Sequence, residues 1–105
     1  MYGTAWKEEK TEELTYNSIV NGFRAIDTAN QRKHYYEVGV GKAIQRALRD
    51  NLIVRNDIFI QTKFTYMAGQ DNRLPYDPKD NLSNQVIQSF ESSLEHLGLN
   101  HIDSY

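Results

Sequence analysis

The sequence predicts an α/β fold in which short parallel strands alternate with helices. Short apolar runs, of which Ile58–Ile60 is the clearest, alternate with longer segments whose apolar residues recur at helical spacing. The stretch Gly22–Ile44 also has the order of one β/α unit: an apolar strand ending on Asp27, a polar loop, and a helix opening at Glu37. Strands separated by helices pair in parallel, because such a connection needs a crossover of about a dozen residues.

The first third of the chain is predicted to hold a strand, a helix and a second strand. Tyr2–Trp6 is short and aromatic, which favours a strand. Thr11 is the expected N-cap of the helix, because acidic residues that suit the positive end of a helix dipole follow it. Asn21-Gly22 should end this helix with a left-handed residue, and Phe23–Ile26 should form the next strand.

The remainder continues the alternation. A helix is expected at Glu37–Arg49, and a third helix should begin with Ser83 as its cap and end at Gly98. Its buried stripe is predicted to be Val86, Phe90, Leu94 and Leu97. Leu99–Tyr105 should begin a fourth strand. The intervening segment 64–82 is long for a connection in a compact domain, which favours a functional loop.

The composition excludes several classes of partner and chemistry. The 105 residues suit one domain, and their net charge of −2 gives no basic surface for nucleic acid or an acidic membrane. There is no cysteine, which removes disulfides, thiolate metal sites and a cysteine nucleophile, and no metal site is predicted. No segment has the apolar length of a signal peptide or membrane span, so the expected location is cytoplasmic.

Two charged residues stand where adjacent strands end. Asp27 closes the second strand and Lys63 closes the third. Parallel β/α folds place their function at the carboxyl ends of the strands, so we expect both side chains at one rim of the sheet. The pair has two interpretations at this point: a salt bridge that closes the rim, or part of a reactive site.

The stretch around Asp27 resembles the first signature of the aldo-keto reductases. The residues that meet it in order are Gly22, Phe23, Arg24, Ile26, Asp27, Thr28, Ala29, Glu37, Val40 and Gly41. The resemblance covers nearly the whole chain but less than half of the family's length. It implies that residues 1–105 are the N-terminal portion of a single (β/α)8 barrel (TIM barrel) domain, holding roughly three β/α units and the start of strand 4.

The resemblance also implies a function: reduction of aldehydes or ketones to alcohols by hydride transfer from NADPH, with a tyrosine as proton donor. Asp27 and Lys63 match the family's catalytic Asp and Lys. A phenol has a reference pKa of about 10, so it needs the nearby ammonium to become a useful acid. Counting back from the Glu37 anchor of the signature lands on His34, so Tyr35, next to it at the loop-to-helix junction, is the predicted donor. Tyr36 is second. The alternative is that these tyrosines only pack.

The segment Gly3-Thr4-Ala5-Trp6 resembles the family's first-strand segment, which lines the nicotinamide and substrate cavity. By this resemblance Gly3 and Thr4, together with Asp27, are expected to contact the NADPH cofactor (NADP). Trp6 and Tyr36 are expected to border the pocket for a small-molecule carbonyl substrate. The alternative for the segment is an ordinary strand end with a packed tryptophan.

The family's catalytic histidine is expected at the end of the fourth strand, just beyond Tyr105. His101 should be a surface residue, and His96 is expected to be solvated or to cap the third helix. Two other functions stay open: a non-catalytic, cofactor-sensing or regulatory subunit on the same scaffold, or a truncated, non-functional fragment. The isolated 105 residues are expected to be inactive and to self-associate, because half a barrel exposes its inner face and two strand edges.

Overall fold

The computed structural model describes all 105 residues and shows an α/β fold with a small parallel sheet. The main elements are β1 (Tyr2–Gly3), α1 (Thr11–Val20), β2 (Ala25–Asp27), α2 (Glu37–Arg49), β3 (Phe59–Gln61) and α3 (Leu82–Leu97). The strands lie in the order β1-β2-β3, and both pairings are parallel. The predicted alternation of strands and helices is therefore confirmed, as are the bounds of the helix Glu37–Arg49.

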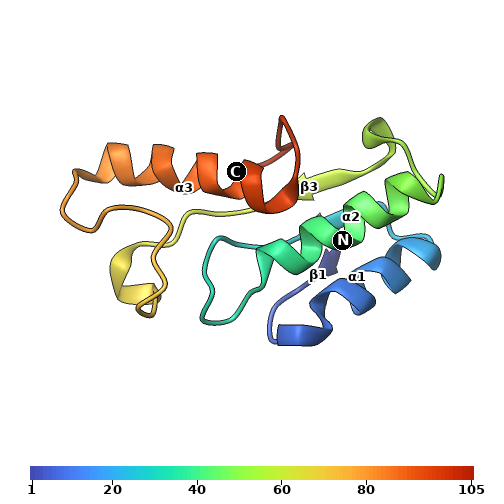
Figure 1. Ribbon diagram of the computed structural model, residues 1–105, viewed down its shortest axis with the longest axis horizontal. Coiled ribbons are helices and arrows are strands. Elements are labelled where there is room, and N and C mark those ends of the chain that lie inside the picture. The colour runs from blue at the N-terminus through green and yellow to red at the C-terminus, as the bar shows by residue number, and fades with distance from the viewer.

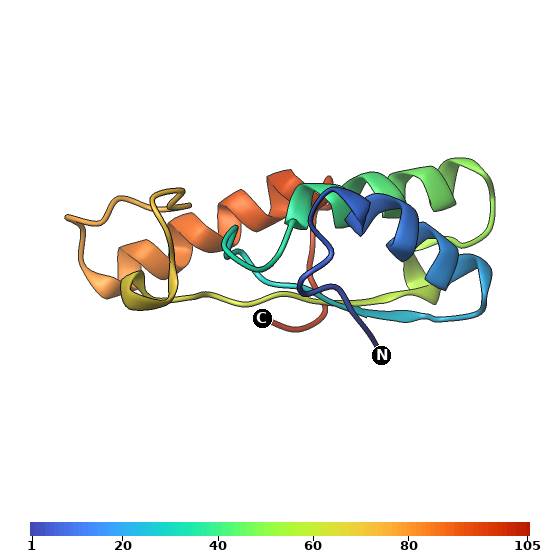
Figure 2. The ribbon, with the colours of Figure 1, turned by 90° about the horizontal axis from the view of Figure 1, so that it is seen from below.

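All three long helices cover one face of the sheet. Figure 1 shows α1, α2 and α3 side by side in front of the strands, and Figure 2 shows the strands as a thin layer beneath them. Ile26 and Ile60, which are opposite each other in the register, are completely buried under this helical layer. They pack in one apolar cluster with Val40 and Ile44 of α2. None of the helices is long and apolar enough to span a membrane.

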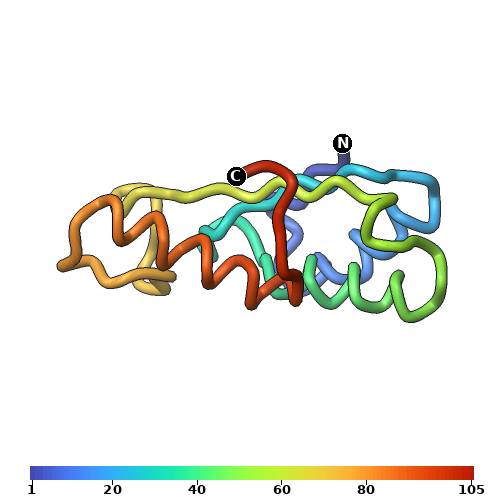
Figure 3. The backbone as a smooth tube through the Cα atoms, turned by 90° about the horizontal axis from the view of Figure 1, so that it is seen from above, coloured from blue at the N-terminus to red at the C-terminus, as the bar shows by residue number.

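The opposite face of the sheet is not covered by any helix. Successive strand residues point to opposite faces, so the neighbours of Ile26 and Ile60 point away from the helices. Asp27 and Gln61 on this face are partly exposed, and Phe59 is 41% exposed. We call it the open face. Figure 3 shows the sheet layer and the helical layer edge-on, with both chain ends at the sheet layer.

The strands are shorter than the sequence predicts. The first strand ends at Gly3, because the chain turns into a left-handed conformation at Trp6 (φ +63°). The second begins at Ala25, two residues later than expected, because the Phe23 amide still donates to Ser18 O at the end of α1. Of the predicted fourth strand, only Ser104 is paired, in a single parallel bridge to Gln61.

Two of the predicted helix caps are wrong. Thr11 is the first residue inside α1, and its hydroxyl donates to Glu8 O of a preceding 3-10 turn (2.7 Å). Asn81 caps α3 in place of Ser83, because its side chain accepts the Asn84 amide. The predicted stop at Gly98 is confirmed by its left-handed conformation (φ +66°).

The third helix buries a polar stripe where the sequence predicts an apolar one. Its buried residues are Gln85, Ser89, Ser93 and Leu97, whereas Val86, Phe90 and Leu94 are only partly buried. The small serines are buried because hydrogen-bonding partners meet them. The Asn30 amide donates to Ser89 O and Ser93 Oγ, and the Tyr105 hydroxyl donates to Ser89 Oγ. The face chosen for burial is thus set by polar contacts that periodicity does not reveal.

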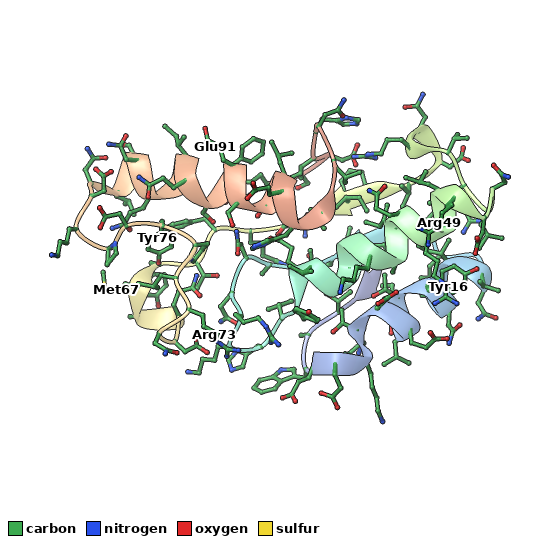
Figure 4. All side chains as sticks on the ribbon, viewed as in Figure 1. Tyr16, Arg49, Met67, Arg73, Tyr76 and Glu91 are labelled. Atoms are coloured by element: carbon green, nitrogen blue, oxygen red, sulfur yellow. The ribbon has the colours of Figure 1, made fainter.

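The long segment between β3 and α3 forms a compact loop that packs on itself. A 3-10 turn at Met67–Gly69 opens it, and Tyr76 is buried with its hydroxyl donating to Thr65 O (2.8 Å). The ring of Tyr76 also packs on Phe64. Figure 4 shows Met67, Arg73 and Tyr76 together at this end of the molecule, far from Tyr16 and Arg49 at the other.

Candidate active site

The predicted ion pair is present at the carboxyl ends of β2 and β3. Lys63 Nζ lies 2.7 Å from Asp27 Oδ1 and also donates to Thr28 O at 2.8 Å. The Lys63 side chain is 41% exposed and that of Asp27 is 21% exposed. The pair is held in place by the parallel register, and it is open to solvent on the open face of the sheet.

Tyr35 lies next to this pair. Lys63 Nζ is 5.3 Å from the centre of the Tyr35 ring, within the range of a cation–π contact. The loop that carries the ring is fixed by its backbone, because the Tyr35 amide donates to Gln31 O and Arg32 donates to Tyr35 O. The Tyr35 hydroxyl has no hydrogen-bond partner within the chain. Asp27, Lys63 and Tyr35 are thus brought together, as expected for a common site.

Tyr36 is in a different environment. The guanidinium of Arg32 stacks over its ring at 4.3 Å, and the residue occupies the N-cap position of α2. A Cβ on Gly39 would come within 2.9 Å of the Tyr36 ring, so the ring is closely packed against the first turn of the helix. Tyr36 has no contact with Lys63. The geometry therefore favours Tyr35 over Tyr36 as the tyrosine that the ammonium acts on.

The first-strand segment meets the same rim through its backbone. The Thr4 amide and hydroxyl both donate to Asp27 O, at 3.1 and 2.9 Å, and Thr4 is completely buried. Its hydroxyl is thus used inside the protein. Gly3 is exposed, and a Cβ there would meet no atom within 4 Å. Space is therefore available at Gly3, whereas Thr4 fixes the end of β2.

The predicted substrate residues do not lie in one pocket. Trp6 is 71% exposed and stacks on His34, with ring centres 3.9 Å apart. A cavity of about 420 Å³ lies between the loop before α2, the long loop and α3. Tyr35 and Tyr36 line it, but Trp6, Asp27 and Lys63 do not. The cavity is therefore beside the ion pair rather than over it.

His96 is not the solvated or capping residue that the sequence predicts. Its Nδ1 is 2.9 Å from Glu37 Oε1, and Glu37 is buried at the start of α2. Thr62, which precedes Lys63, donates to the other carboxylate oxygen of Glu37. This cluster ties α2 and α3 to the end of β3. A glutamate at a helix start gives no sequence signal of such a role, because it also suits an exposed first turn.

The sequence analysis also missed Gln61. Its side-chain amide donates to Asp27 Oδ1 at 2.8 Å, so this oxygen accepts hydrogen bonds from both Lys63 and Gln61. A signal was present, because Gln61 stands two residues before Lys63 and alternate residues of a strand share a face. Gln61 is therefore the third polar side chain at this rim.

Comparison with known proteins agrees with this geometry. The sequence model of the aldo/keto reductase family matches residues 2–105, and the chain belongs to this family. The aldo-keto reductase AKR2E4 of the silkworm Bombyx mori is 31% identical over 106 residues, covering 98% of this chain and 30% of its own length. A D-xylose reductase of Pachysolen tannophilus, described as NAD(P)H-dependent, is 40% identical over 58 residues, which are 55% of this chain and 18% of that protein.

Solved structures show the same relationship. The crystal structure of Bombyx mori AKR2E4 in complex with NADP superposes with a TM-score of 0.73 at 27% identity, covering 96% of this chain and 31% of that one. The chain thus spans about a third of the length of the relatives that it matches along its whole length. Its small parallel sheet and α/β fold agree with membership of the aldo/keto reductase family.

Proposed function

We propose that the full-length protein that carries this chain reduces aldehydes or ketones to alcohols with NADPH as hydride donor. The observation that carries the proposal is the Asp27–Lys63 ion pair with Tyr35 beside it, at the carboxyl ends of two parallel strands. Membership of the aldo/keto reductase family and the NADP complex of a similar structure support the choice of reaction and cofactor.

We also propose that residues 1–105 form the N-terminal portion of a single (β/α)8 barrel, with the open face as its inner wall. One-sided helical cover supports this, since barrels carry their helices outside. The bridge at Ser104 marks where a fourth strand would continue beside β3. Phe59 would then enter a packed interior. Self-association of the isolated 105 residues, through this face and the strand edges, stays a prediction.

In the proposed reaction Tyr35 donates the proton to the carbonyl oxygen. Lys63 provides a positive charge near the ring, which would stabilise the phenolate left after the transfer. Asp27 holds the ammonium and balances its charge. Each group therefore acts through its neighbour, and the order of contact along the rim is Asp27, Lys63, Tyr35.

The residues at the rim fit a nicotinamide cofactor in part. Asp27 Oδ2 has no partner within the chain, so it is free to accept a hydrogen bond from a bound hydroxyl or amide, and Gly3 leaves open space nearby. Thr4 would contribute through its position rather than its hydroxyl, which is already bonded. NADPH supplies the hydride. Trp6 and Tyr36 are proposed to border the carbonyl substrate.

The test is NADPH consumption by the full-length protein with a panel of aldehydes and ketones. Tyr35→Phe keeps the ring and removes the acid, so turnover should fall by about 10² or more, with unchanged folding. Tyr36→Phe is the matched control and should keep most of the activity. A loss confined to Tyr36→Phe would transfer the role to that residue. NADPH binding without turnover of any substrate would favour the regulatory alternative.

A further inference from the structure

Gln61 is placed to control the orientation of Asp27. Its Nε2 donates to Asp27 Oδ1 (2.8 Å), the same oxygen that receives Lys63 Nζ (2.7 Å). No other side chain of this chain donates to the carboxylate of Asp27. A carboxylate attached through rotatable bonds needs a second contact to have a defined direction, and Gln61 supplies it.

The direction of the Gln61 amide is itself determined. A carboxylate only accepts hydrogen bonds, so the amide group that faces Asp27 must be the NH₂. The amide oxygen then faces the other way, where the Ser104 hydroxyl donates to it at 3.0 Å. Ser104 is the residue that bridges to Gln61 in the backbone register. A chain of side-chain hydrogen bonds therefore runs from Ser104 through Gln61 to Asp27.

We propose that Gln61 is a positioning residue for the reaction, acting through Asp27 on Lys63. The inference rests on the proposed function. By holding Asp27 Oδ1 toward the ammonium, Gln61 keeps Lys63 at the Tyr35 ring, and it does so without adding charge to the rim. Side chains that orient the ligands of a metal site by hydrogen bonds typically contribute about 10- to 100-fold in activity, and we expect an effect of the same size here.

Three variants of the full-length protein test this proposal. Gln61→Met keeps the length of the side chain and removes the donor, so kcat should fall about 10- to 100-fold while KM changes little. Gln61→Glu places a second carboxylate against Asp27 and should lose at least as much at neutral pH. Gln45→Met is the matched control, because Gln45 bonds Leu97 O and Gly98 O, away from the rim. It should keep wild-type kcat.

The pH profile separates positioning from packing. When the pH falls and the carboxylate introduced by Gln61→Glu takes up a proton, its O–H can donate to Asp27 while its carbonyl still accepts from Ser104. The ratio of Gln61→Glu activity to wild-type activity should therefore rise at acid pH, whereas the same ratio for Gln61→Met should stay flat. A merely structural glutamine would give no acid recovery. Wild-type-like kcat in Gln61→Met, or parallel pH profiles for both variants, would overturn the proposal.

Failure of the proposed function gives a different result. In that case the wild-type protein would show no NADPH consumption with any carbonyl of the panel. Crystal structures of the variants then decide the positioning role without any activity measurement. An Asp27 carboxylate that turns away from Lys63 in Gln61→Met, but not in Gln45→Met, supports it. An unmoved carboxylate in Gln61→Met overturns it.

Discussion

Two ion pairs involve residues next to β3, with the same N–O distance of 2.7 Å, but they differ in what surrounds them. Asp103 accepts the Ile60 amide as well as Arg55, and Arg55 donates to the carbonyls of Ile58 and His101. That pair is bonded into the backbone on both sides. The side chains of Asp27 and Lys63 make one bond to the backbone, at Thr28 O, and otherwise bond only to side chains. Asp27 Oδ2 has no partner within the chain.

The difference shows that a short N–O distance alone does not identify an ion pair as part of a reactive site. Arg55 and Asp103 close the turn before β3 and attach residues 101–103 to it, so both side chains are bonded to the backbone. Lys63 and Asp27 stand at the other end of the strand, where a parallel fold leaves room for ligands, and a tyrosine ring is adjacent. We therefore expect the first pair to contribute to stability, whereas the second is the pair to which the proposed function gives a chemical role.

The largest expected effect is a loss of activity when the Asp27–Lys63 pair is broken. Lys63→Met in the full-length protein should lower turnover about 10²-fold or more, because the phenolate left after proton transfer loses the positive charge beside it. The free energy of unfolding should change by less than about 1 kcal/mol, since the lysine is 41% exposed. Steady-state NADPH consumption and urea unfolding measure the two quantities. A large loss of stability with retained turnover would exchange the roles of the pairs.

Asp103→Asn should give the opposite result. The asparagine can still accept the Ile60 amide, but the charge-assisted bonds are lost, which costs about 1–2 kcal/mol of stability. Turnover per folded molecule should stay within about twofold of wild type. Glu13→Gln is the control, because it breaks an exposed pair with Arg46 and should leave the urea midpoint close to that of wild type. Equal urea midpoints for Asp103→Asn and wild type would contradict the structural assignment.

A smaller effect concerns pH. Burial opposes ionisation of Asp103, but the hydrogen bonds from the Ile60 amide and Arg55 outweigh it, so its pKa lies below the usual value. A carboxyl with a lowered folded pKa adds stability above its ordinary pKa of about 3.9, and this stability is lost as pH falls through the folded value. Urea midpoints should therefore fall less steeply with acid in Asp103→Asn than in wild type. Parallel curves would exclude Asp103 as a contributor.

The sequence was sufficient where one strong local signal acts. The helix Glu37–Arg49 has a wide apolar face and its bounds were predicted correctly. The positions of Asp27 and Lys63 at strand ends were enough to predict their contact, because parallel register brings such residues to one rim. Their catalytic roles, and that of Tyr35, stay predictions.

The predictions from sequence were wrong where hydrogen bonds of polar side chains determine the local structure. Thr11 and Ser83 have the chemistry of caps, but Asn81 and a 3-10 turn take the helix starts. The buried face of α3 is turned by one residue because Asn30 reaches its serines from a distant loop. Strand alternation places Gln61 on the face of Lys63, but it does not indicate the bond from Gln61 to Asp27. Such contacts join residues far apart in sequence, and local patterns do not contain them.

The most direct test is a double-mutant cycle between Tyr35 and Lys63 in the full-length protein, measured as kcat for NADPH-dependent carbonyl reduction. If Lys63 acts by making the Tyr35 phenol acidic, Tyr35→Phe already removes everything that the lysine assists. The double variant should then lose little more than Tyr35→Phe alone, because residues that act as a unit are not additive. Fully additive losses would show that the two side chains work separately, and would contradict the account of the site.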